Sequence, residues 1–411
     1  MNGEAAPSSV LARFYETETD HDGTVSLHLV DEDLDGVWIA DGRLKGRGVL
    51  VDTRAVQVGF DDRGRLVGYP VDPLEVRGGS LCFDPSQGGV RARENRRALG
   101  AFNRVVAEAN HFGMINAFVH TRRAAEFAGG LLSAVGGPAL PPVTVVVGAH
   151  FGSQLPGYAS GDGSRRSGRV RPLSGGHYRL SQRTTDVPEL FPVDPKGEIH
   201  LGPRRYRKPF AGWQAYLANA AHNPAIVYHE YGHHLCRYTA DLRLNGERRP
   251  EEQRNGKTGI EEGVCDYFTA ALLGTGRPYG WYRPERGRLR DPMHHRRISD
   301  ADRGDPHSEG AAWAAALWRC RSELVDKGLL ESQARNDEAL VAALVTVGHV
   351  AGPRGGRGRA RRERKRSKAT TIVAAYRSAL EDRGGFEAAR EAQRIIEESG
   401  LITPGVSEMV G

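Results

Sequence analysis

The sequence predicts an α+β fold in which a β-rich segment comes first and helices predominate towards the end. Residues 1–95 hold short apolar runs with strand-like alternation, separated by Asp-Gly and Asp-Arg-Gly turns. A helical pattern over residues 93–130 then precedes the apolar run 143–147, which is typical of a buried strand. From residue 246 onward, apolar residues recur at helical spacing.

The chain has 411 residues, which is enough to bury a large core and to divide into two or three domains. The first 95 residues are either a separate small domain or the leading strands of the unit that follows. Residues 152–190 are rich in Gly, Ser and Arg and are expected to form an irregular loop. Residues 196–202 are expected to form another short strand.

A further helix is predicted to begin at residue 224, and it contains the residues that are candidates for metal binding and catalysis. Asn223 is a good N-cap residue, and Pro224 suits the first helical position because its missing N–H costs nothing there. Asn245-Gly246 is expected to close the far end of this helix.

The same helix contains the pattern H-E-x-x-H. His229 and His233 lie four residues apart, so their side chains stand one turn apart on a single helix face and can bind one Zn²⁺. Glu230 projects beside them, where it can accept a proton from a metal-bound water. The alternative is an accidental grouping on a solvated helix face, because five-residue patterns recur by chance. His234 is expected to support the site or to lie on the surface, and Cys236 to be a small buried thiol in preference to a ligand.

A catalytic zinc site takes three protein ligands and leaves one position open. The third ligand is sought in the next predicted helix, residues 258–268, where Thr258 and Glu261 have capping-box spacing. This spacing assigns Glu261 to the start of the helix and leaves Glu262 free to point inward as the ligand. Asp266, one turn later, can accept the other N–H of a ligand histidine; its alternative role is an ordinary ion pair.

H-E-x-x-H followed by a helix bearing E-x-x-x-D resembles the gluzincin metallopeptidases of the thermolysin and fungalysin type. The resemblance implies that Glu262 is the third zinc ligand and that Asp266 orients the first histidine. Residues 302–318 resemble the segment in which that family carries a second active-site histidine, which hydrogen-bonds the tetrahedral oxyanion. His307 matches that histidine, with Asp302 five residues upstream to steady it; Asp305 competes for the same role.

The resemblance also implies two lobes, with the H-E-x-x-H helix at their junction. The expected divisions are a β-rich N-terminal module, an α/β lobe and a helical lobe, at residues 1–95, 96–245 and 246–411. Residues 116–120, Asn-Ala-Phe-Val-His, are similar to a fungalysin segment that precedes the central sheet. In such a fold one strand pairs with the peptide substrate, and either 143–147 or 196–202 can fill that place.

The formal net charge of +6 arises from one segment of the chain. Residues 354–368 contain seven Arg, two Lys and one Glu, so they carry +8 and the remainder carries −2. This basic run can bind nucleic acid or an acidic partner, but it lacks the interleaved aromatic residues that stack on bases. A solvated, disordered loop between helices is the preferred interpretation, and nucleic acid is not expected as a partner.

The spacing of the cysteines and the first nine residues indicate the cellular compartment of the protein. The four cysteines form no C-x-x-C pair and no dense framework, which indicates reduced thiols. Residues 1–9 lack the basic and apolar regions of a signal peptide, and no apolar run is long enough to cross a bilayer. Since thermolysin relatives are usually secreted, these features favour a cytoplasmic enzyme with no membrane partner; export by an unconventional route is the alternative.

The sequence therefore predicts a zinc-dependent endopeptidase that hydrolyses peptide or protein substrates. His229, His233 and Glu262 are the expected ligands of Zn²⁺, with Glu230 as general base and His307 as the partner of the oxyanion. Two other hypotheses are a non-catalytic zinc-binding scaffold of the same fold and a nucleic-acid-binding protein that acts through residues 354–368.

Overall fold

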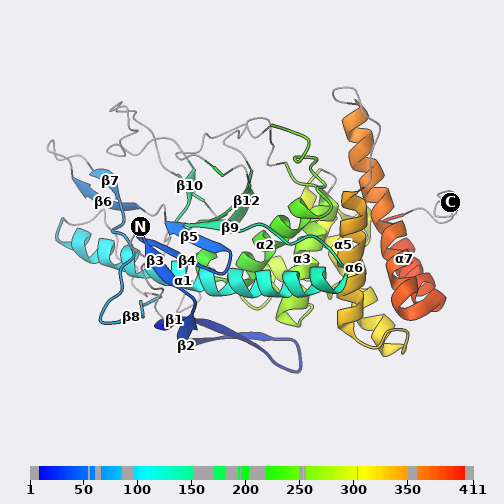
Figure 1. Ribbon diagram of the computed structural model, residues 1–411, viewed down its shortest axis with the longest axis horizontal. Helices are drawn as coiled ribbons and strands as arrows, with labels where there is room; N and C mark the ends of the chain where they lie inside the picture. The colour runs from blue at the N-terminus through cyan, green and yellow to red at the C-terminus, as the bar shows by residue number, and fades with distance from the viewer. Residues whose placement is uncertain are drawn as a thin grey trace.

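The computed structural model combines a β-rich N-terminal region with a helical C-terminal region. In Figure 1 the strands gather at one end of the molecule and α3, α5, α6 and α7 at the other. The structure describes residues 9–53, 56–60, 66–85, 96–151, 171–173, 175–180, 193–194, 196–202, 219–249, 253, 256–302, 304–349 and 359–402.

Of the three smaller sheets in the described part of the chain, two are formed by strands from the first 95 residues. The longer one pairs β1 (Ser9–Thr19) with β2 (Val25–Asp35) over the full length of both strands, and β8 (Ser80–Leu81) joins β1 in parallel. The shorter one pairs β6 (Val56–Phe60) with β7 (Leu66–Pro70). The strands β2, β6 and β7 were expected from the alternation of apolar residues, whereas β1 was not.

The main sheet has six strands in the order β12-β13-β9-β5-β4-β3. Their bounds, in chain order, are β3 (Trp38–Ala40), β4 (Arg43–Gly46), β5 (Val49–Thr53), β9 (Val143–Val147), β12 (Gly176–Arg179) and β13 (Glu198–Leu201). Central β9 pairs in parallel with β5 and β13, and the outer pairs are antiparallel. Strands from the first 95 residues thus share one sheet with later strands, which favours the leading-strand interpretation of that segment over a separate domain.

Strand β12 corrects two expectations from the sequence. It lies within residues 152–190, where an irregular loop was expected; a short ladder of β10 (His150–Phe151) and β11 (Arg171–Pro172) also reaches into that range. Strands β9 and β13, the two proposed partners of a peptide substrate, each have a neighbour on both sides, so neither can accept another strand. Within the described part of the sheet, β12 is the last strand on the side of the predicted active site.

Helix α1 (Arg96–Ala134) runs along the sheet and connects it to the helical region, as Figure 1 shows in cyan. The segment 116–120 lies in the buried middle of this helix. The Asn116 side chain accepts the Tyr15 N–H at 3.0 Å and donates to the Ala221 carbonyl at 2.8 Å. His120 Nδ1 lies 2.7 Å from the Tyr228 hydroxyl. The bond to Tyr228 ties the H-E-x-x-H helix to α1, and the Asn116 bonds tie α1 to β1 and to the residues just before that helix.

The helical region has a second apolar core of its own. It is built mainly from α3 (Gly259–Leu273), α5 (Pro306–Asp326), α6 (Gln333–Gly348) and α7 (Arg359–Glu398), while the short α4 (Pro284–Arg290) lies beside α5. Helix α7 is interrupted at Gly385, which has φ 78° and ψ 179°, so its two halves correspond to the two separate helices expected there.

The sequence suggested that the basic run is a loop, but part of it is helical. Residues 354–358 lie outside the described residues, but α7 begins at Arg359 and the backbone is helical from there. Arg, Lys, Ala and Glu all favour helix, which explains why this highly charged stretch adopts one. Lys368 is buried and its ammonium donates to the Ala240 carbonyl at 2.7 Å. Among the described helices, none is long and apolar enough to span a bilayer.

Glycines bring α3 and α5 unusually close. A Cβ atom on Gly310 would lie 2.7 Å from Glu262 Cβ, and one on Gly263 would overlap Trp313. Both positions therefore need glycine for steric reasons, and the close approach places the first turn of α5 beside Glu262.

Candidate metal centre

Helix α2 (Pro224–Tyr238) begins as the sequence predicts. Asn223 Oδ1 accepts the backbone N–H groups of Ala225 and Ile226 at 3.0 and 3.4 Å, and Pro224 is the first helical residue. The end of α2, however, comes earlier than Asn245-Gly246.

The early end of α2 has a local cause. The Thr239 hydroxyl and N–H both donate to the Leu235 carbonyl, at 2.7 and 3.1 Å. Asp241 then adopts a φ of 42° and its carboxylate accepts the N–H groups of Asn245 and Gly246 at 3.0 and 2.8 Å. These side-chain bonds replace the next helical turn, which explains the difference from the prediction.

Helix α3 also begins at the predicted cap, but Glu261 has another role. Thr258 Oγ1 accepts the Glu261 N–H at 3.3 Å, as a cap should. The Glu261 carboxylate instead turns to His233 Nδ1 at 2.8 Å and to Arg243 Nε at 2.8 and 2.9 Å. Bonds to a buried guanidinium and an imidazole are stronger than the return bond of a capping box, so the assignment of Glu261 to the cap was wrong.

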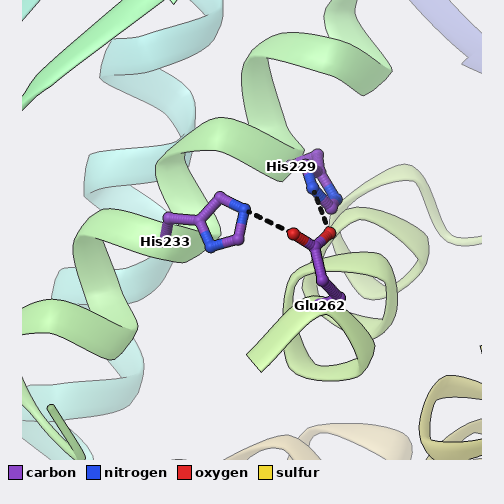
Figure 2. Close-up of side chains that lie close together, drawn as sticks. All are labelled: His229, His233 and Glu262. Atoms are coloured by element: carbon purple, nitrogen blue, oxygen red, sulfur yellow. Dashed lines mark ion pairs between the residues drawn. The ribbon is translucent and has the colours of Figure 1, made fainter. Parts of the chain in front are cut away.

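Three side chains from α2 and α3 converge on one point, as Figure 2 shows. His229 Nε2 lies 3.2 Å from Glu262 Oε2, and His233 Nε2 lies 3.5 Å from Glu262 Oε1. One ligand atom from each residue lies within 4.8 Å of the other two, and all three residues are buried. This buried group can hold a metal ion.

Two carboxylates fix the tautomers of the histidine rings. Asp266 Oδ1 lies 2.9 Å from His229 Nδ1, and Glu261 Oε1 lies 2.8 Å from His233 Nδ1. Because an ionised carboxylate only accepts hydrogen bonds, each Nδ1 donates, so Nε2, which faces Glu262, is the nitrogen left to bind a metal. This is the arrangement in which a histidine ligates a metal through Nε2.

The two rings differ in their proton affinity. Burial and the nearby Lys257 charge lower the pKa of His233 to about 4, so its Nε2 is unprotonated at neutral pH. Burial also disfavours the charged form of His229, but its bonds to Asp266 and Glu262 raise its pKa overall. A metal ion therefore competes with a proton at His229.

The hydrogen bonding of the buried polar atoms indicates whether the site fits a metal ion. His233 Nε2 and Glu230 Oε2 are buried and lack a hydrogen-bond partner within the described residues, and both Glu262 carboxylate oxygens make ion pairs there but no hydrogen bond of acceptable geometry. Buried polar atoms in folded proteins are almost always paired, so this cluster is unusual for a structural role. Two imidazoles and one carboxylate with inward lone pairs fit a divalent cation.

Glu230 lies next to the converging ligands. It comes from α2 and is buried, and its Oε2 is 4.0 Å from His233 Nε2. A Cβ atom on Gly176 of β12 would lie 2.7 Å from Glu230 Oε1, so the edge strand passes directly over this carboxylate. Burial raises the pKa of Glu230, but Lys257 and the two histidines outweigh that effect and lower it overall. The side chain is therefore an ionised carboxylate that can accept a proton.

His307 reaches the site from the first turn of α5. Its Nε2 lies 3.6 Å from Glu262 Oε2, and its Nδ1 lies 3.2 Å from Asp305 Oδ1. The residue that steadies this ring is therefore Asp305, the competitor, and not Asp302. Asp305 caps α5 by accepting the His307 N–H at 3.0 Å, which keeps its carboxylate beside the ring. Asp302 is exposed and its backbone N–H donates to Ser308 Oγ at 2.9 Å.

Several residues at the centre carry no recognisable sequence signal. Arg290, at the end of α4, pairs with Asp266 at 2.5 Å and lies 3.7 Å from Glu262 Oε2. The Tyr279 hydroxyl donates to the same Asp266 carboxylate at 2.5 Å. Burial opposes ionisation of Asp266, but the Arg290 charge and the His229 hydrogen bond lower its pKa to about 2. Together these contacts hold Asp266 as an anion against His229.

His234 and Cys236 lie on the same helix, α2, but outside the group of converging ligands. His234 is buried, with Nδ1 3.0 Å from the Tyr178 hydroxyl and Nε2 3.0 Å from the Pro141 carbonyl, so it supports the helix and does not lie on the surface. Cys236 is a buried free thiol, as expected, and does not belong to the group that can hold a metal.

Replacing Glu261 by Gln is expected to reduce the affinity for a divalent metal ion by about 10- to 100-fold, because it removes the anion that orients His233 and leaves the Arg243 charge unpaired. Competition with a chromophoric chelator measures this affinity. Glu309→Gln is the matched control, since that carboxylate faces the Gly304 N–H at 3.4 Å. Equal affinities in the two variants would show that Glu261 does not orient the ring.

Comparison of the sequence with protein-family models gives no match, and comparison with curated proteins gives none either.

Proposed function

We propose that this chain is a zinc-dependent endopeptidase with the two-lobed architecture of thermolysin-like and fungalysin-like gluzincins. The observation that supports the proposal most is the convergence of His229, His233 and Glu262, with Glu230 and His307 on its margins. A sheet with a long helix against it, followed by a helical region, is consistent with that architecture. Because one fold serves many functions, the site and not the fold carries the proposal.

Zinc is the metal that this ligand set favours. Two histidines and one glutamate are a common catalytic zinc set, in which the fourth position stays open for water or substrate. When bound, zinc would polarise the scissile carbonyl group and lower the pKa of a water molecule towards neutrality.

The side chains around the metal position can supply the proton transfers, the oxyanion contact and the orientation of the ligand rings. Glu230 would take a proton from the attacking water and later deliver it to the leaving amine, as a general base and then a general acid. His307, whose Nδ1 lies beside Asp305, would donate from Nε2 to the oxyanion when its ring is protonated. Burial lowers the pKa of this ring, and the nearby Glu262 charge partly offsets that effect. Asp266 and Glu261 would keep the ligand rings in the required tautomer.

Strand β12 is the proposed place of the substrate backbone. It is the last strand in the described order of the main sheet, and Gly176 passes over Glu230. A peptide added to this edge by backbone hydrogen bonds would extend past the general base. The absence of a side chain at Gly176 leaves Glu230 room at that crossing.

Digestion of a peptide library tests the proposal and separates it from the alternatives. We expect cleavage that a chelator abolishes and added zinc restores. Zinc binding without cleavage would support the scaffold hypothesis instead. Steeply salt-dependent binding to nucleic acid that is lost on deletion of residues 354–368 would support the third hypothesis.

A further inference from the structure

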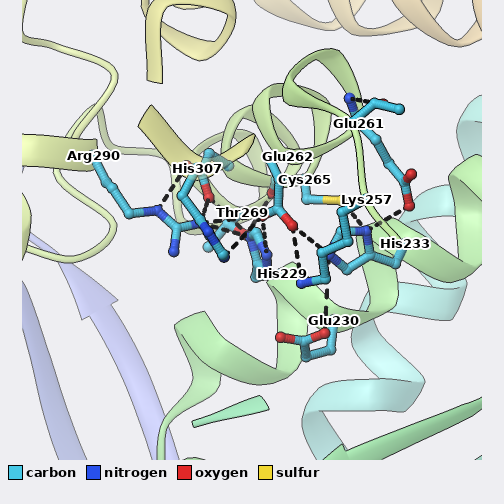
Figure 3. A network of polar contacts seen from close by, with 12 residues as sticks. His229, Glu230, His233, Lys257, Glu261, Glu262, Cys265, Thr269, Arg290 and His307 are labelled. Atoms are coloured by element: carbon cyan, nitrogen blue, oxygen red, sulfur yellow. Dashed lines mark hydrogen bonds and ion pairs between the residues drawn. The ribbon is translucent and has the colours of Figure 1, made fainter. Parts of the chain in front are cut away.

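Lys257 places a positive charge inside the candidate metal centre. It precedes α3, its side chain is only 11% exposed, and its Nζ lies 2.9 Å from Glu262 Oε1. Figure 3 shows the lysine reaching in beside Glu262, with Glu230 below it. A buried ammonium this close to a proposed metal ligand is not part of the H-E-x-x-H chemistry, so it needs its own explanation.

The other buried cations at the centre have carboxylate partners outside the ligand group. Arg243 pairs with Glu261 at 2.6 Å, and Arg290 pairs with Asp266 at 2.5 Å. Lys257 has its close contact with Glu262, the residue that would also bind the metal. Metal and ammonium would therefore share one carboxylate.

The two Glu262 oxygens face different groups. Oε2 lies near His229 Nε2 at 3.2 Å and His307 Nε2 at 3.6 Å, while Oε1 lies near Lys257 at 2.9 Å and His233 Nε2 at 3.5 Å. An ion bound through Oε2 would lie one carboxylate away from the ammonium. At roughly 5 Å and an effective dielectric constant of about 20, two unit charges change a binding constant by on the order of 100-fold.

We propose that Lys257 acts as a fixed positive charge that weakens binding of the metal cation and strengthens binding of anionic ligands at the open coordination position. The inference rests on the proposed metal centre and adds a residue that selects for anions there. The ligands it favours are tetrahedral or carboxylate-like anions, which include the oxyanion formed on peptide hydrolysis.

The charge changes during the proposed reaction indicate what Lys257 would contribute to catalysis. When water attacks the carbonyl carbon, a C–O bond forms, the carbonyl π electrons move to oxygen, and the water proton moves to Glu230. Glu230 thereby loses the negative charge that faces Lys257, while the substrate gains one. A fixed cation at this centre therefore keeps an anionic partner through the step, first the Glu230 carboxylate and then the oxyanion.

A pair of variants tests this inference through binding and not through activity. Lys257→Met keeps most of the apolar length of lysine without its charge, and Lys257→Arg keeps the charge. Zinc affinity is measured by chelator competition. The affinity of the zinc-loaded protein for dimethylphosphinate, a tetrahedral anion, is measured by titration calorimetry.

We expect Lys257→Met to bind zinc at least about tenfold more tightly and the phosphinate at least about tenfold more weakly than the wild type. Lys257→Arg is expected to resemble the wild type in both. Two changes of opposite sign cannot arise from loss of folding, which would weaken both. Unchanged affinity for either ligand, or weaker zinc binding in Lys257→Met, would overturn the inference. If the wild-type protein binds no zinc, the proposed function fails together with it.

Discussion

A Glu230→Gln protein is expected to bind zinc as tightly as the wild type and to cleave peptides about 10²- to 10⁴-fold more slowly. Glutamine has nearly the same shape as glutamate but cannot take a proton from water at neutral pH. Glu230 does not belong to the group that can hold the metal, and its Oε2 lies 4.0 Å from His233 Nε2, so the ligand set stays intact. The rate constant kcat, measured at saturating peptide and equal zinc content, gives the effect.

The zinc content of the Glu230→Gln protein serves as the internal control. A variant that loses both zinc and activity would place Glu230 among the structural supports of the site. Wild-type rates in a fully loaded variant would rule out Glu230 as the general base.

Replacing Asp337 by Ala is expected to have the largest effect on stability, a loss of about 3–5 kcal/mol, because it leaves a buried guanidinium unpaired. Asp337 accepts from Arg321 Nε at 3.0 Å and from the Tyr267 hydroxyl, and all three residues are buried between α3, α5 and α6. For a chain of this length, such a loss lowers the thermal midpoint by roughly 5 °C, which calorimetry measures.

The matched control for Asp337 is Glu331→Ala. The Glu331 side chain is 83% exposed and lies 3.8 Å from Arg335, so its removal is expected to leave the midpoint unchanged. Equal midpoints for the two variants would mean that the buried network does not stabilise the helical region.

Local signals in the sequence predicted those parts of the fold that depend on interactions between residues close in sequence. The N-caps at Asn223 and Thr258 and the strand β9 are confirmed, because capping bonds form between residues close in sequence and a run of β-branched apolar residues favours a buried strand. The expectation of a loop over residues 152–190 is wrong at β12, which contains no apolar alternation, while residues 152–170 and 181–190 lie outside the described residues. The pairing of β12 with β13 is a tertiary event that composition does not reveal.

The candidate site shows the same division between local and tertiary information. The spacing of His229, His233 and Glu262 on two helices was enough to predict that they meet. The role of Glu261 depended on Arg243, which lies 18 residues upstream in an irregular segment. Lys257, in the loop before α3, likewise has no pattern that marks it as buried. Charges brought together by the tertiary fold are not encoded in any short motif, so these residues emerge only from the structure.

The metal content of the purified protein tests the central claim most directly. Wild-type chain and Glu262→Ala are each loaded with zinc, dialysed and analysed by elemental mass spectrometry. If two imidazoles and one carboxylate form the coordination shell, the wild type retains about one zinc ion per chain and the variant loses most of it. A wild-type protein without zinc, or a variant that retains as much as the wild type, would contradict the account.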